Sequence, residues 1–255
     1  MGLDGKVVVV TGAGAGIGRG VALHCAQQGA SVVVANRSTE HGEQTVREIA
    51  AAGGQALFVA VDVSDEAQVR ALFDTTLAHF GRLDGLVSNA GIGARRLGDG
   101  PVDECTLEAW ETVMAVNLRG TFLVCKHALP ALLEHRGAIV TMSSVLGTVG
   151  TQGLFDTHAY ATSKAGIIGL TRSIAVHYAA RGVRANCLTP GLIDTAMATR
   201  TKADVELSER VTFWQPLKSL GEVHDVAGIT AFLLSDAAGF ITGATIPVDG
   251  GWSAQ

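Results

Sequence analysis

The stretch Lys6-Val7-Val8-Val9-Val10-Thr11-Gly12-Ala13-Gly14-Ala15-Gly16-Ile17-Gly18 sets a run of valines directly before four alternating glycines. The valines predict a strand buried on both faces, because β-branched side chains suit a covered parallel sheet. The glycines predict a tight turn into a helix, where the backbone can approach a pyrophosphate at the positive helix end. A turn without a ligand is the alternative, and an ATP-type loop is disfavoured because no Lys-Ser or Lys-Thr pair follows the glycines. The candidate contacts with a dinucleotide cofactor are Gly12, Ala15, Gly16, Ile17 and Gly18.

Short apolar runs and segments of helical period alternate along the rest of the chain, with no linker or internal repeat between them. This alternation predicts an α/β fold: a Rossmann-like, doubly wound, seven-stranded parallel sheet with helices on both faces. We expect one domain over residues 1–255, with a substrate lid near 192–216. The predicted strands are Lys6–Val10, Ser31–Ala35, Ala56–Val61, Leu83–Ser88, Ala138–Met142, Val183–Leu188 and Thr245–Val248. The predicted helices are Gly18–Gln28, Thr39–Ala52, Asp65–Phe80, Thr106–Glu134, Ala159–Ala180 and Glu222–Leu234.

The composition excludes several classes of protein. Apolar residues make up 47% of the 255 residues and charged residues 17%, which excludes a disordered chain. The net charge is −5 and the longest basic run is the pair Arg95-Arg96, so we expect no nucleic-acid partner. No apolar run approaches the roughly 20 residues that span a bilayer, and Met1–Lys6 lacks a signal-peptide layout. We therefore expect a cytoplasmic protein with no metal site, whose four scattered cysteines (Cys25, Cys105, Cys125 and Cys187) are buried and reduced.

The end of the second predicted strand bears on the choice of cofactor. An acidic residue there would accept a hydrogen bond from the 2′-hydroxyl of the adenosine ribose and would repel a 2′-phosphate. This chain instead has neutral Asn36 followed by Arg37, whose forked guanidinium suits a phosphate. We expect a slight preference for NADP(H), with NAD(H) as the alternative if Arg37 is a solvated residue or stacks on adenine. Asp62 follows the third strand, and either accepts from the adenine amino group or caps the helix that starts near Asp65.

Tyr160 and Lys164 stand one turn apart in a predicted helix, so the phenol and the ammonium lie on one helix face. A nearby cation favours the phenolate, and a phenol of lowered pKa can exchange a proton with a carbonyl or alcohol near neutral pH. Alone, such a pair is more often an ordinary surface contact. Ser144, however, ends the fifth predicted strand at the sheet edge where doubly wound folds bind ligands, and its hydroxyl can bind the same substrate oxygen.

With these motifs in order, the chain resembles the short-chain dehydrogenase/reductase family over essentially its whole length. The resemblance implies that Tyr160 is the acid/base, that Lys164 lowers its pKa and binds the nicotinamide ribose, and that Ser144 positions the carbonyl. It also implies that Asn117 holds a helix kink and a water that links Lys164 to solvent. The further cofactor contacts that it implies are Val63, Asn89, Ala90, Gly91, Pro190, Gly191, Ile193 and Thr195. The stretches that carry the resemblance are Thr11–Gly18, Asp62-Val63, Ser88–Gly91, Asn117, Ser143-Ser144, Tyr160–Lys164, Asn186, Thr189–Gly191, Thr242-Gly243 and Val248–Gly251.

Two departures from the family pattern leave alternatives open. Ser144 and Tyr160 are 16 positions apart, which is longer than usual in the family, so Ser143 is the alternative for the serine. Members that prefer NADP often carry a basic residue in the glycine-rich turn, where this chain has Ala15.

The function that follows is an NAD(P)-dependent oxidoreductase that interconverts a ketone and a secondary alcohol. The alternatives are a 3-oxoacyl-acyl-carrier-protein reductase, for which Arg95-Arg96 and Arg136 offer little basic surface, and a non-catalytic dinucleotide sensor. The family also implies a homotetramer, with contacts through Thr106–Glu134, Ala159–Ala180 and Val248–Trp252. A hydrophobic or alicyclic small-molecule substrate is expected from an apolar wall around the site, formed by Leu97, Leu154, Phe155, Met197, Phe213 and Trp214. The alternative is that most of these side chains only pack the lid.

Overall fold

The computed structural model contains the predicted seven-stranded parallel sheet, with strand order β3-β2-β1-β4-β5-β6-β7. It describes residues 2–151, 153, 155–199, 203–217 and 220–255. Every neighbouring pair of strands is parallel, and β1, β4 and β5 are buried along their whole length, as the runs of valine and isoleucine predict. The strands are β1 (Val7–Thr11), β2 (Ser31–Asn36), β3 (Gln55–Ala60), β4 (Gly85–Ser88), β5 (Ala138–Met142), β6 (Arg184–Pro190) and β7 (Thr245–Val248).

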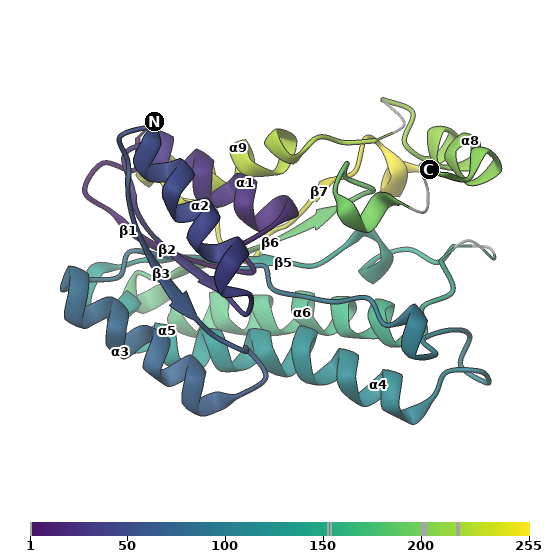
Figure 1. The fold of residues 1–255 in the computed structure, drawn as a ribbon, viewed down its shortest axis with the longest axis horizontal. Helices are drawn as coiled ribbons and strands as arrows, with labels where there is room; N and C mark the ends of the chain where they lie inside the picture. Colours follow the sequence, from purple (N-terminus) through teal and green to yellow (C-terminus); the bar gives the residue numbers. More distant parts are fainter. Residues whose placement is uncertain (1, 152, 154, 200–202, 218–219) are drawn as a thin grey trace.

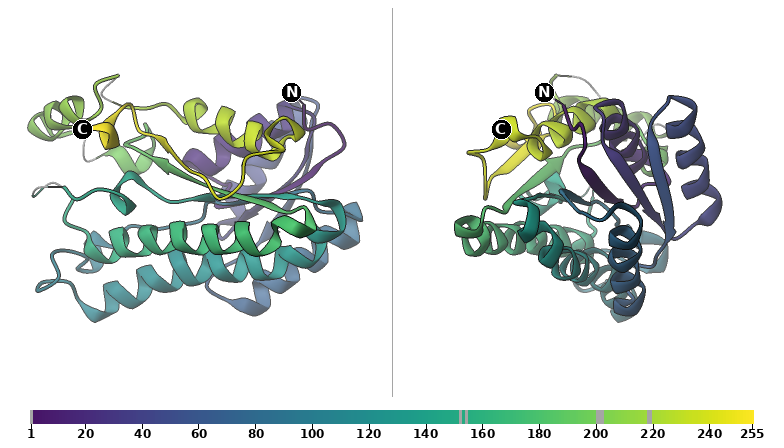
Figure 2. Two further views of the ribbon diagram at one scale, coloured as in Figure 1. Left: turned by 180° about the vertical axis from the view of Figure 1, so that it is seen from behind. Right: turned by 90° about the vertical axis from the view of Figure 1, so that its left-hand side faces the viewer.

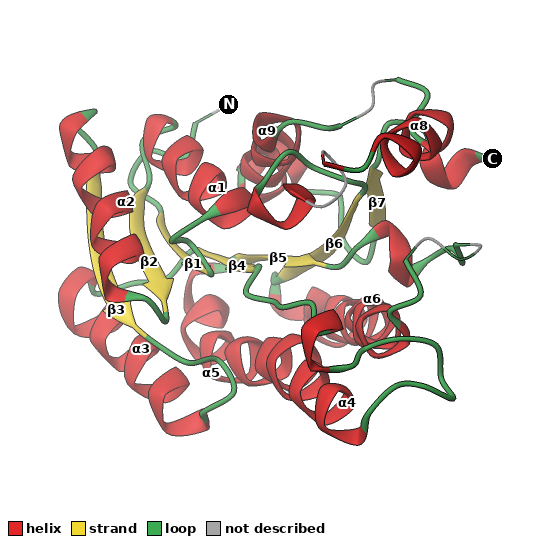
Figure 3. Ribbon diagram, turned by 45° about the vertical axis from the view of Figure 1, so that its right-hand side comes forward, coloured by secondary structure: helices red, strands yellow, loops and turns green. Residues whose placement is uncertain are grey.

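Helices cover both faces of the sheet, so the molecule has three layers (Figures 1 and 2). One layer holds α1, α2 and α9, and the other holds α3, α4, α5 and α6, with the sheet between them as in Figure 3. Two apolar cores result, one on each face, and both consist largely of strand valines and the inward faces of these helices. The helices are α1 (Gly16–Gln27), α2 (Thr39–Ala51), α3 (Glu66–Phe80), α4 (Leu107–Val113), α5 (Gly120–His135), α6 (His158–Tyr178), α8 (Val205–Trp214) and α9 (Val223–Leu234).

The helix predicted as one element over Thr106–Glu134 is divided in the structure. A π-helical turn, η2 (Met114–Arg119), separates α4 from α5 and contains Asn117. Its buried side chain bonds across to Ile92 in the loop after β4, donating to the carbonyl and accepting from the amide. A widened turn of this kind is common at functional sites. The helix is therefore interrupted at Asn117, where the family resemblance implies a kink.

The predicted lid near 192–216 contains a helix that the sequence analysis did not assign. Asp204 caps α8 by accepting from the amide of Leu207, and Leu207 and Val211 face inward one turn apart. An acidic residue before such a spacing is an ordinary helix signal, and it was detectable in the sequence. Leu154, which we placed in the apolar wall, lies outside the described residues.

Three of the four cysteines are buried as expected, and all four are free thiols. Cys105 differs, because it is partly exposed on the loop before α4 with its sulfur 3.9 Å from Asp99 Oδ1. Among the described residues, no helix is both long and apolar enough to cross a membrane.

The strand order determines where a ligand can bind. The chain winds outward from β1 to β3, then returns to place β4 on the other side of β1. In doubly wound sheets the crevice at such a reversal, beyond the carboxyl ends of the strands, is the ligand site. The glycine-rich turn follows β1, Asn89 follows β4 and Ser144 follows β5, so the predicted residues meet at this edge.

Candidate active site

The glycine-rich turn packs against its neighbours too closely for side chains. A Cβ on Gly18 would lie 2.3 Å from the carbonyl oxygen of Gly12, and a Cβ on Gly14 would lie 2.5 Å from the amide nitrogen of Asn36. Gly12 and Gly16 also have positive φ angles of 67° and 52°, which glycine adopts at little cost. The turn therefore presents bare backbone to the crevice.

The amino end of α1 is free to bind an anion. Its N-cap residue is Ala15, which has no side-chain acceptor, and its first turn contains no acidic residue. Other helices of the same sheet are capped by side chains, namely α2 by Ser38, α3 by Asp65 and α4 by Thr106. Unpaired amides at a positive helix end suit a pyrophosphate, so this turn fits the phosphate portion of a dinucleotide.

Asn36 and Arg37 differ in how firmly they are held. The Asn36 side chain rests on the glycine-rich turn and donates to the carbonyl of Ser38 at 2.9 Å. Arg37 is exposed, near enough to Asp62 for its guanidinium to help lower the pKa of that carboxyl. The larger cause of the lowered pKa is the Ser64 hydroxyl, which donates to Asp62 Oδ1 at 2.6 Å.

The alternative that Asp62 caps the following helix is wrong. Asp65 is the cap of α3, accepting from the amides of Ala67 and Gln68. Asp62 instead closes a local turn with Ser64, because its carboxylate lies two residues before an available amide and hydroxyl. The neighbouring Val63 is buried and packs against Gly120 of α5.

Asn89, Ala90 and Gly91 join the ends of the two central strands. The Thr11 hydroxyl accepts from the amides of Asn89 and Ala90, and the Asn89 side chain donates to the Thr11 carbonyl at 3.0 Å. A Cβ on Gly91 would lie 3.3 Å from both Asn117 Oδ1 and Lys164 Nζ. The turn after β4 therefore reaches from the glycine-rich turn to the predicted catalytic side chains.

The structure brings Tyr160 and Ser144 together. The Ser144 hydroxyl lies close enough to the phenol to lower the pKa of Tyr160, although burial raises that pKa more strongly. Lys164, which we expected to lower this pKa, is not among the causes of the shift. Ser143, the alternative serine, donates to the main-chain carbonyl of Lys164 at 2.7 Å and so ties β5 to α6. The geometry thus favours Ser144 over Ser143 as the hydroxyl beside Tyr160.

Lys164 is buried beneath the tyrosine. Its Nζ lies 5.5 Å from the centre of the Tyr160 ring and donates to the carbonyl of Met142, at the end of β5, at 2.9 Å. Burial lowers the pKa of Lys164 to about 8, only partly opposed by the neighbouring Cys187 thiol group. The ammonium is therefore fixed in place and close to its titration range at neutral pH.

The segment after β6 forms the far wall of the crevice. Pro190 ends the strand, and a Cβ on Gly191 would lie 2.4 Å from Gln215 Oε1, so the chain passes closely here. Gln215 is buried at 2% exposure and donates from its amide to the Leu192 carbonyl. The buried Ile193 and the Thr195 side chain follow, and the Thr195 methyl faces the Gly16 backbone.

Aromatic side chains from three separate segments pack together beside α8. Trp252, near the carboxyl end, lies 5.0 Å from Trp214 of α8 and 6.0 Å from Phe155 of the β5–α6 loop, between ring centres. Trp252 is buried, so this part of the predicted subunit-contact segment Val248–Trp252 is packed within the chain itself. Other members of the predicted apolar wall are exposed, namely Leu97, Met197 and Phe213.

Sequence reasoning missed several residues that organise this site. Asp99, from the loop after β4, accepts from the amides of Ala159 and Tyr160 at the start of α6. Ser163 accepts from Asn117 Nδ2 at 3.1 Å and donates to the Tyr160 carbonyl at 2.7 Å. Ser163 stands directly before Lys164 and was visible beside the motif, whereas nothing local marks Asp99.

Comparison with known proteins agrees with this geometry. A family model described as Enoyl-(Acyl carrier protein) reductase matches residues 12–253. The chain is 42% identical over 250 residues to cis-4-hydroxycyclohexanecarboxylate dehydrogenase of Sinomonas cyclohexanicum, covering 98% of this chain and 97% of the relative. It is also 40% identical over 248 residues to a 3-oxoacyl-acyl-carrier-protein reductase of Staphylococcus aureus, covering 96% and 97%.

A solved structure shares the whole architecture. A short-chain type dehydrogenase/reductase from Mycobacterium marinum superimposes with a TM-score of 0.92 at 32% sequence identity. The match covers 100% of this chain and 98% of that protein. The similarity therefore extends beyond the sheet to the carboxyl-terminal segment.

Proposed function

The chain belongs to the short-chain dehydrogenase/reductase family and is an NAD(P)-dependent oxidoreductase, and we propose that Tyr160 is its acid/base, supported by Ser144, Lys164 and Asn117. The observation that carries this proposal is the placement of the Lys164 ammonium 5.5 Å from the centre of the Tyr160 ring, with the Ser144 hydroxyl close to the phenol. These groups meet at the carboxyl ends of the central strands, beside the glycine-rich turn.

The bound nicotinamide cofactor supplies or accepts the hydride. Gly12, Ala15, Gly16, Ile17 and Gly18 would hold its pyrophosphate, because their bare backbone ends at the uncapped start of α1. The adenosine would lie along the ends of β2, β3 and β4. The nicotinamide would lie near the segment after β6. The residues assigned to these two parts are Asn36, Arg37, Asp62, Val63, Asn89, Ala90, Gly91, Pro190, Gly191, Ile193 and Thr195.

In the reaction, Ser144 would orient the substrate oxygen and Tyr160 would exchange the proton at that oxygen. Because Ser144 lies beside Tyr160, both hydroxyls would reach one substrate oxygen. Lys164 would hold the ribose hydroxyls and favour the phenolate by its charge. Asn117 donates to the Ser163 hydroxyl, which donates to the Tyr160 carbonyl. The π-helical turn that contains Asn117 would thus connect Tyr160 and Lys164 to the loop after β4.

Lys164→Met should weaken the cofactor complex and raise the stability of the fold. Loss of a charged donor to the ribose costs about tenfold in affinity, and kcat/KM falls with it. Burial lowers the pKa of Lys164 from 10.5 to about 8, which corresponds to a cost of roughly 3 kcal/mol at neutral pH. The lost bond to the Met142 carbonyl offsets about 1 kcal/mol of this gain.

The size of the stability effect depends on pH. Below about pH 8 the amine of Lys164 is charged in the folded and the unfolded state, and the full cost of burying the charge applies. Between about pH 8 and 10.5 the folded amine loses its proton, so this cost falls progressively and disappears near pH 10.5. The variant should therefore melt higher than the parent at pH 7, by a margin that shrinks toward pH 10. Thermal melts at the two pH values and fluorescence titration of the cofactor measure both effects. An unchanged cofactor affinity would show that Lys164 does not bind the ribose.

For the substrate we propose a six-membered carbocyclic secondary alcohol or the matching ketone. The relative from Sinomonas cyclohexanicum acts, by its name, on a hydroxycyclohexanecarboxylate. Phe155, Trp214 and Trp252 form an aromatic group from the β5–α6 loop, α8 and the carboxyl end. Such a group suits an apolar ring, since aromatic side chains bury large apolar areas.

The acyl-carrier-protein alternative is less well supported by the charges. Docking of an acidic carrier needs a basic surface near the site. Arg136 follows α5 and lines a hollow with Lys6 and Asp84 at the amino ends of the strands, on the opposite edge from Tyr160. Of the three arginines predicted for docking, only Arg95 and Arg96 lie on the same edge of the sheet as Tyr160, on the loop after β4.

A single assay separates these functions. Cyclohexanols, cyclohexanones and their 4-carboxylates should be tested against a 3-oxoacyl thioester, each with NAD(H) and NADP(H). Turnover of the carbocycles at least tenfold more efficient than that of the thioester supports the proposal, and the reverse ranking supports the carrier-protein reductase. Cofactor binding without turnover of any compound would favour the non-catalytic sensor.

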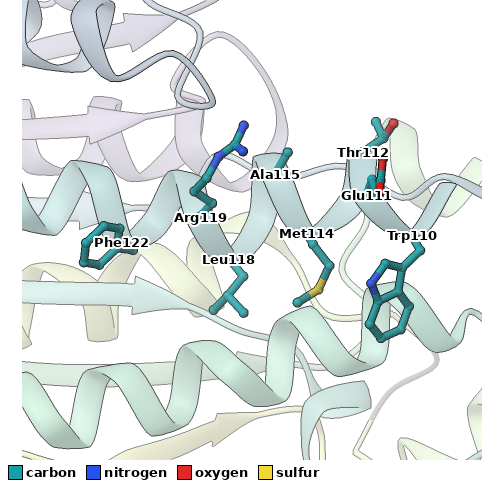
Figure 4. Close-up of a pocket in the computed structure, with 8 residues that line it drawn as sticks. All are labelled: Trp110, Glu111, Thr112, Met114, Ala115, Leu118, Arg119 and Phe122. Atoms are coloured by element: carbon teal, nitrogen blue, oxygen red, sulfur yellow. The ribbon is translucent and has the colours of Figure 1, made fainter. Parts of the chain in front are cut away.

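We further propose that the enzyme is a cytoplasmic homotetramer, with subunit contacts on the outer faces of α4, α5 and α6. A groove of about 700 Å³ runs over α4, η2 and α5, lined by Trp110, Met114, Leu118 and Phe122 among others (Figure 4). Phe122 of α5 is 46% exposed and Val176 of α6 is 81% exposed, so both helices carry an exposed apolar side chain. Surfaces of this kind favour contact with a second copy. The four free thiols are consistent with a reducing compartment.

Charge on this face should dissociate the tetramer. We expect the parent to sediment as a tetramer, and the double variant Phe122→Glu with Val176→Glu to sediment as a smaller species, because burying two carboxylates is costly. Val102→Glu changes another exposed apolar residue, outside these helices, and should leave the tetramer intact. A parent that sediments as a monomer at every concentration would refute the assembly.

A further inference from the structure

The first turn of α6 is held by a residue from a distant loop. Thr157, at the N-cap position, makes no side-chain bond to the helix backbone. Instead Asp99 Oδ1 accepts from the amide of Ala159 at 3.0 Å, and Asp99 Oδ2 accepts from the amide of Tyr160 at 3.1 Å. The carbonyl of Gly100 accepts from the amide of His158. Thus the first three amides of this helix bond to residues about 60 positions earlier in the chain.

The Asp99 carboxylate is itself firmly placed. It is 3% exposed, and its own amide donates to the carbonyl of Ala94 at 3.0 Å. Thr106 closes the same loop, bonding through its amide to Gly98 and through its hydroxyl to the carbonyl of Leu97. A small apolar cluster of Ala94, Ala109, Val113 and Ala159 packs the loop, α4 and α6 together, with the ring of Tyr160 against it. A buried cap in such surroundings holds the helix end rigidly.

Tyr160 is consequently fixed through both ends of its main chain. Asp99 binds its amide, and the Ser163 hydroxyl binds its carbonyl at 2.7 Å. Its partner Ser144 belongs to the end of β5, whose position is set by the sheet. Any displacement of the first turn of α6 relative to β5 would therefore separate the two hydroxyls that must share one substrate oxygen.

We propose that Asp99 is a positioning residue for the reaction, which caps α6 and thereby holds the Tyr160 hydroxyl beside Ser144. This rests on the proposed role of Tyr160. Asp65 provides the comparison, because it caps α3 in the same way, with one carboxylate oxygen accepting from the amides of Ala67 and Gln68, but contacts none of the predicted catalytic residues among the bonds the structure describes. If Asp99 only stabilised the fold, its removal would lower the melting temperature without lowering kcat, as we expect for Asp65.

The test compares Asp99→Ala, Asp99→Asn and Asp65→Ala with the parent. A misplacement of about 1 Å can cost 10²-fold in rate, so we expect kcat to fall roughly 10- to 100-fold in Asp99→Ala. Asp99→Asn keeps one acceptor oxygen and should lose only several-fold. Cofactor affinity, measured by fluorescence titration, should stay within twofold of the parent, because the glycine-rich turn is untouched. Asp65→Ala should lower the melting temperature but leave kcat unchanged at 25 °C.

Amide hydrogen exchange gives a second readout. Exchange over the first turn of α6 should speed up in Asp99→Ala and less in Asp99→Asn, in the same order as the loss of kcat. A parent-like kcat in a folded Asp99→Ala would overturn the inference. If that variant does not fold, a parent-like kcat in Asp99→Asn would do so. Should Tyr160→Phe be active, the proposed function fails instead, so the two failures are distinguishable.

Discussion

Tyr160→Phe should lower kcat/KM by about 10²- to 10⁴-fold, the range that a positioned acid/base contributes. The substitution removes one hydroxyl and keeps the ring that packs against Ala159 and the loop after β4. Ser144 would still bind a substrate oxygen but would have no partner to exchange the proton. The cofactor contacts assigned to the glycine-rich turn and to Lys164 remain, so the dissociation constant of the cofactor should change by no more than about twofold. Steady-state kinetics and fluorescence titration on the same preparations measure both quantities.

The chain contains a matched control, because it has two tyrosines. Tyr178, at the far end of the same helix, stacks with Arg181 and lies outside the site. Tyr178→Phe removes the same hydroxyl and should keep parental activity. Activity of Tyr160→Phe within tenfold of the parent would exclude Tyr160 as the acid/base. Loss of activity in both variants would point to the helix rather than to the phenol.

Asn36→Asp combined with Arg37→Ile should reverse the cofactor preference, from NADP(H) in the parent to NAD(H) in the variant. The 2′-phosphate carries about −1.5 to −2 charge near neutral pH, and a charge-assisted bond to Arg37 contributes roughly 1.5–3 kcal/mol. Arg37 is exposed and also interacts electrostatically with Asp62. We therefore expect the lower end of this energy range, which is about tenfold in affinity. In the variant an acidic side chain at 36, beside the glycine-rich turn, would accept from the ribose hydroxyl and repel a phosphate.

The measurement is kcat/KM for both cofactors in the parent, the double variant and a charge control. Arg47→Ile removes a cation from α2, the helix that follows Arg37, where Arg47 pairs with Glu43. It should leave the ratio of the two cofactors unchanged, whereas a general field effect would shift it. A parent that prefers NAD(H) tenfold or more would show that Arg37 does not recognise a phosphate.

Much of this site could be predicted because its signals are local. The strand before the glycine-rich turn, the spacing of Tyr160 and Lys164, and the serine that ends β5 each depend on neighbours a few positions away. Cap residues such as Asp65 and Thr106 act on amides two or three positions on. Alternation of such elements restricts the topology strongly, since parallel crossovers have one hand. The order of these motifs along the chain then supported the resemblance to the family, from which the remaining residue roles were predicted.

The sequence by itself thus determined the sheet, its helical layers and the edge at which the predicted residues gather. Only the tertiary structure decided which of the two adjacent serines lies beside Tyr160, and that Asp99 caps α6, the helix that carries Tyr160. It also decided that Trp252, near the carboxyl end, packs against Trp214 of α8. It also decided the balance of charges, because burial raises the pKa of Tyr160 and lowers that of Lys164. The physical reason is the distance along the chain over which each interaction acts. Periodicity and capping act within a turn or a strand, whereas burial, desolvation and bonds across about 60 positions exist only once distant segments have packed together.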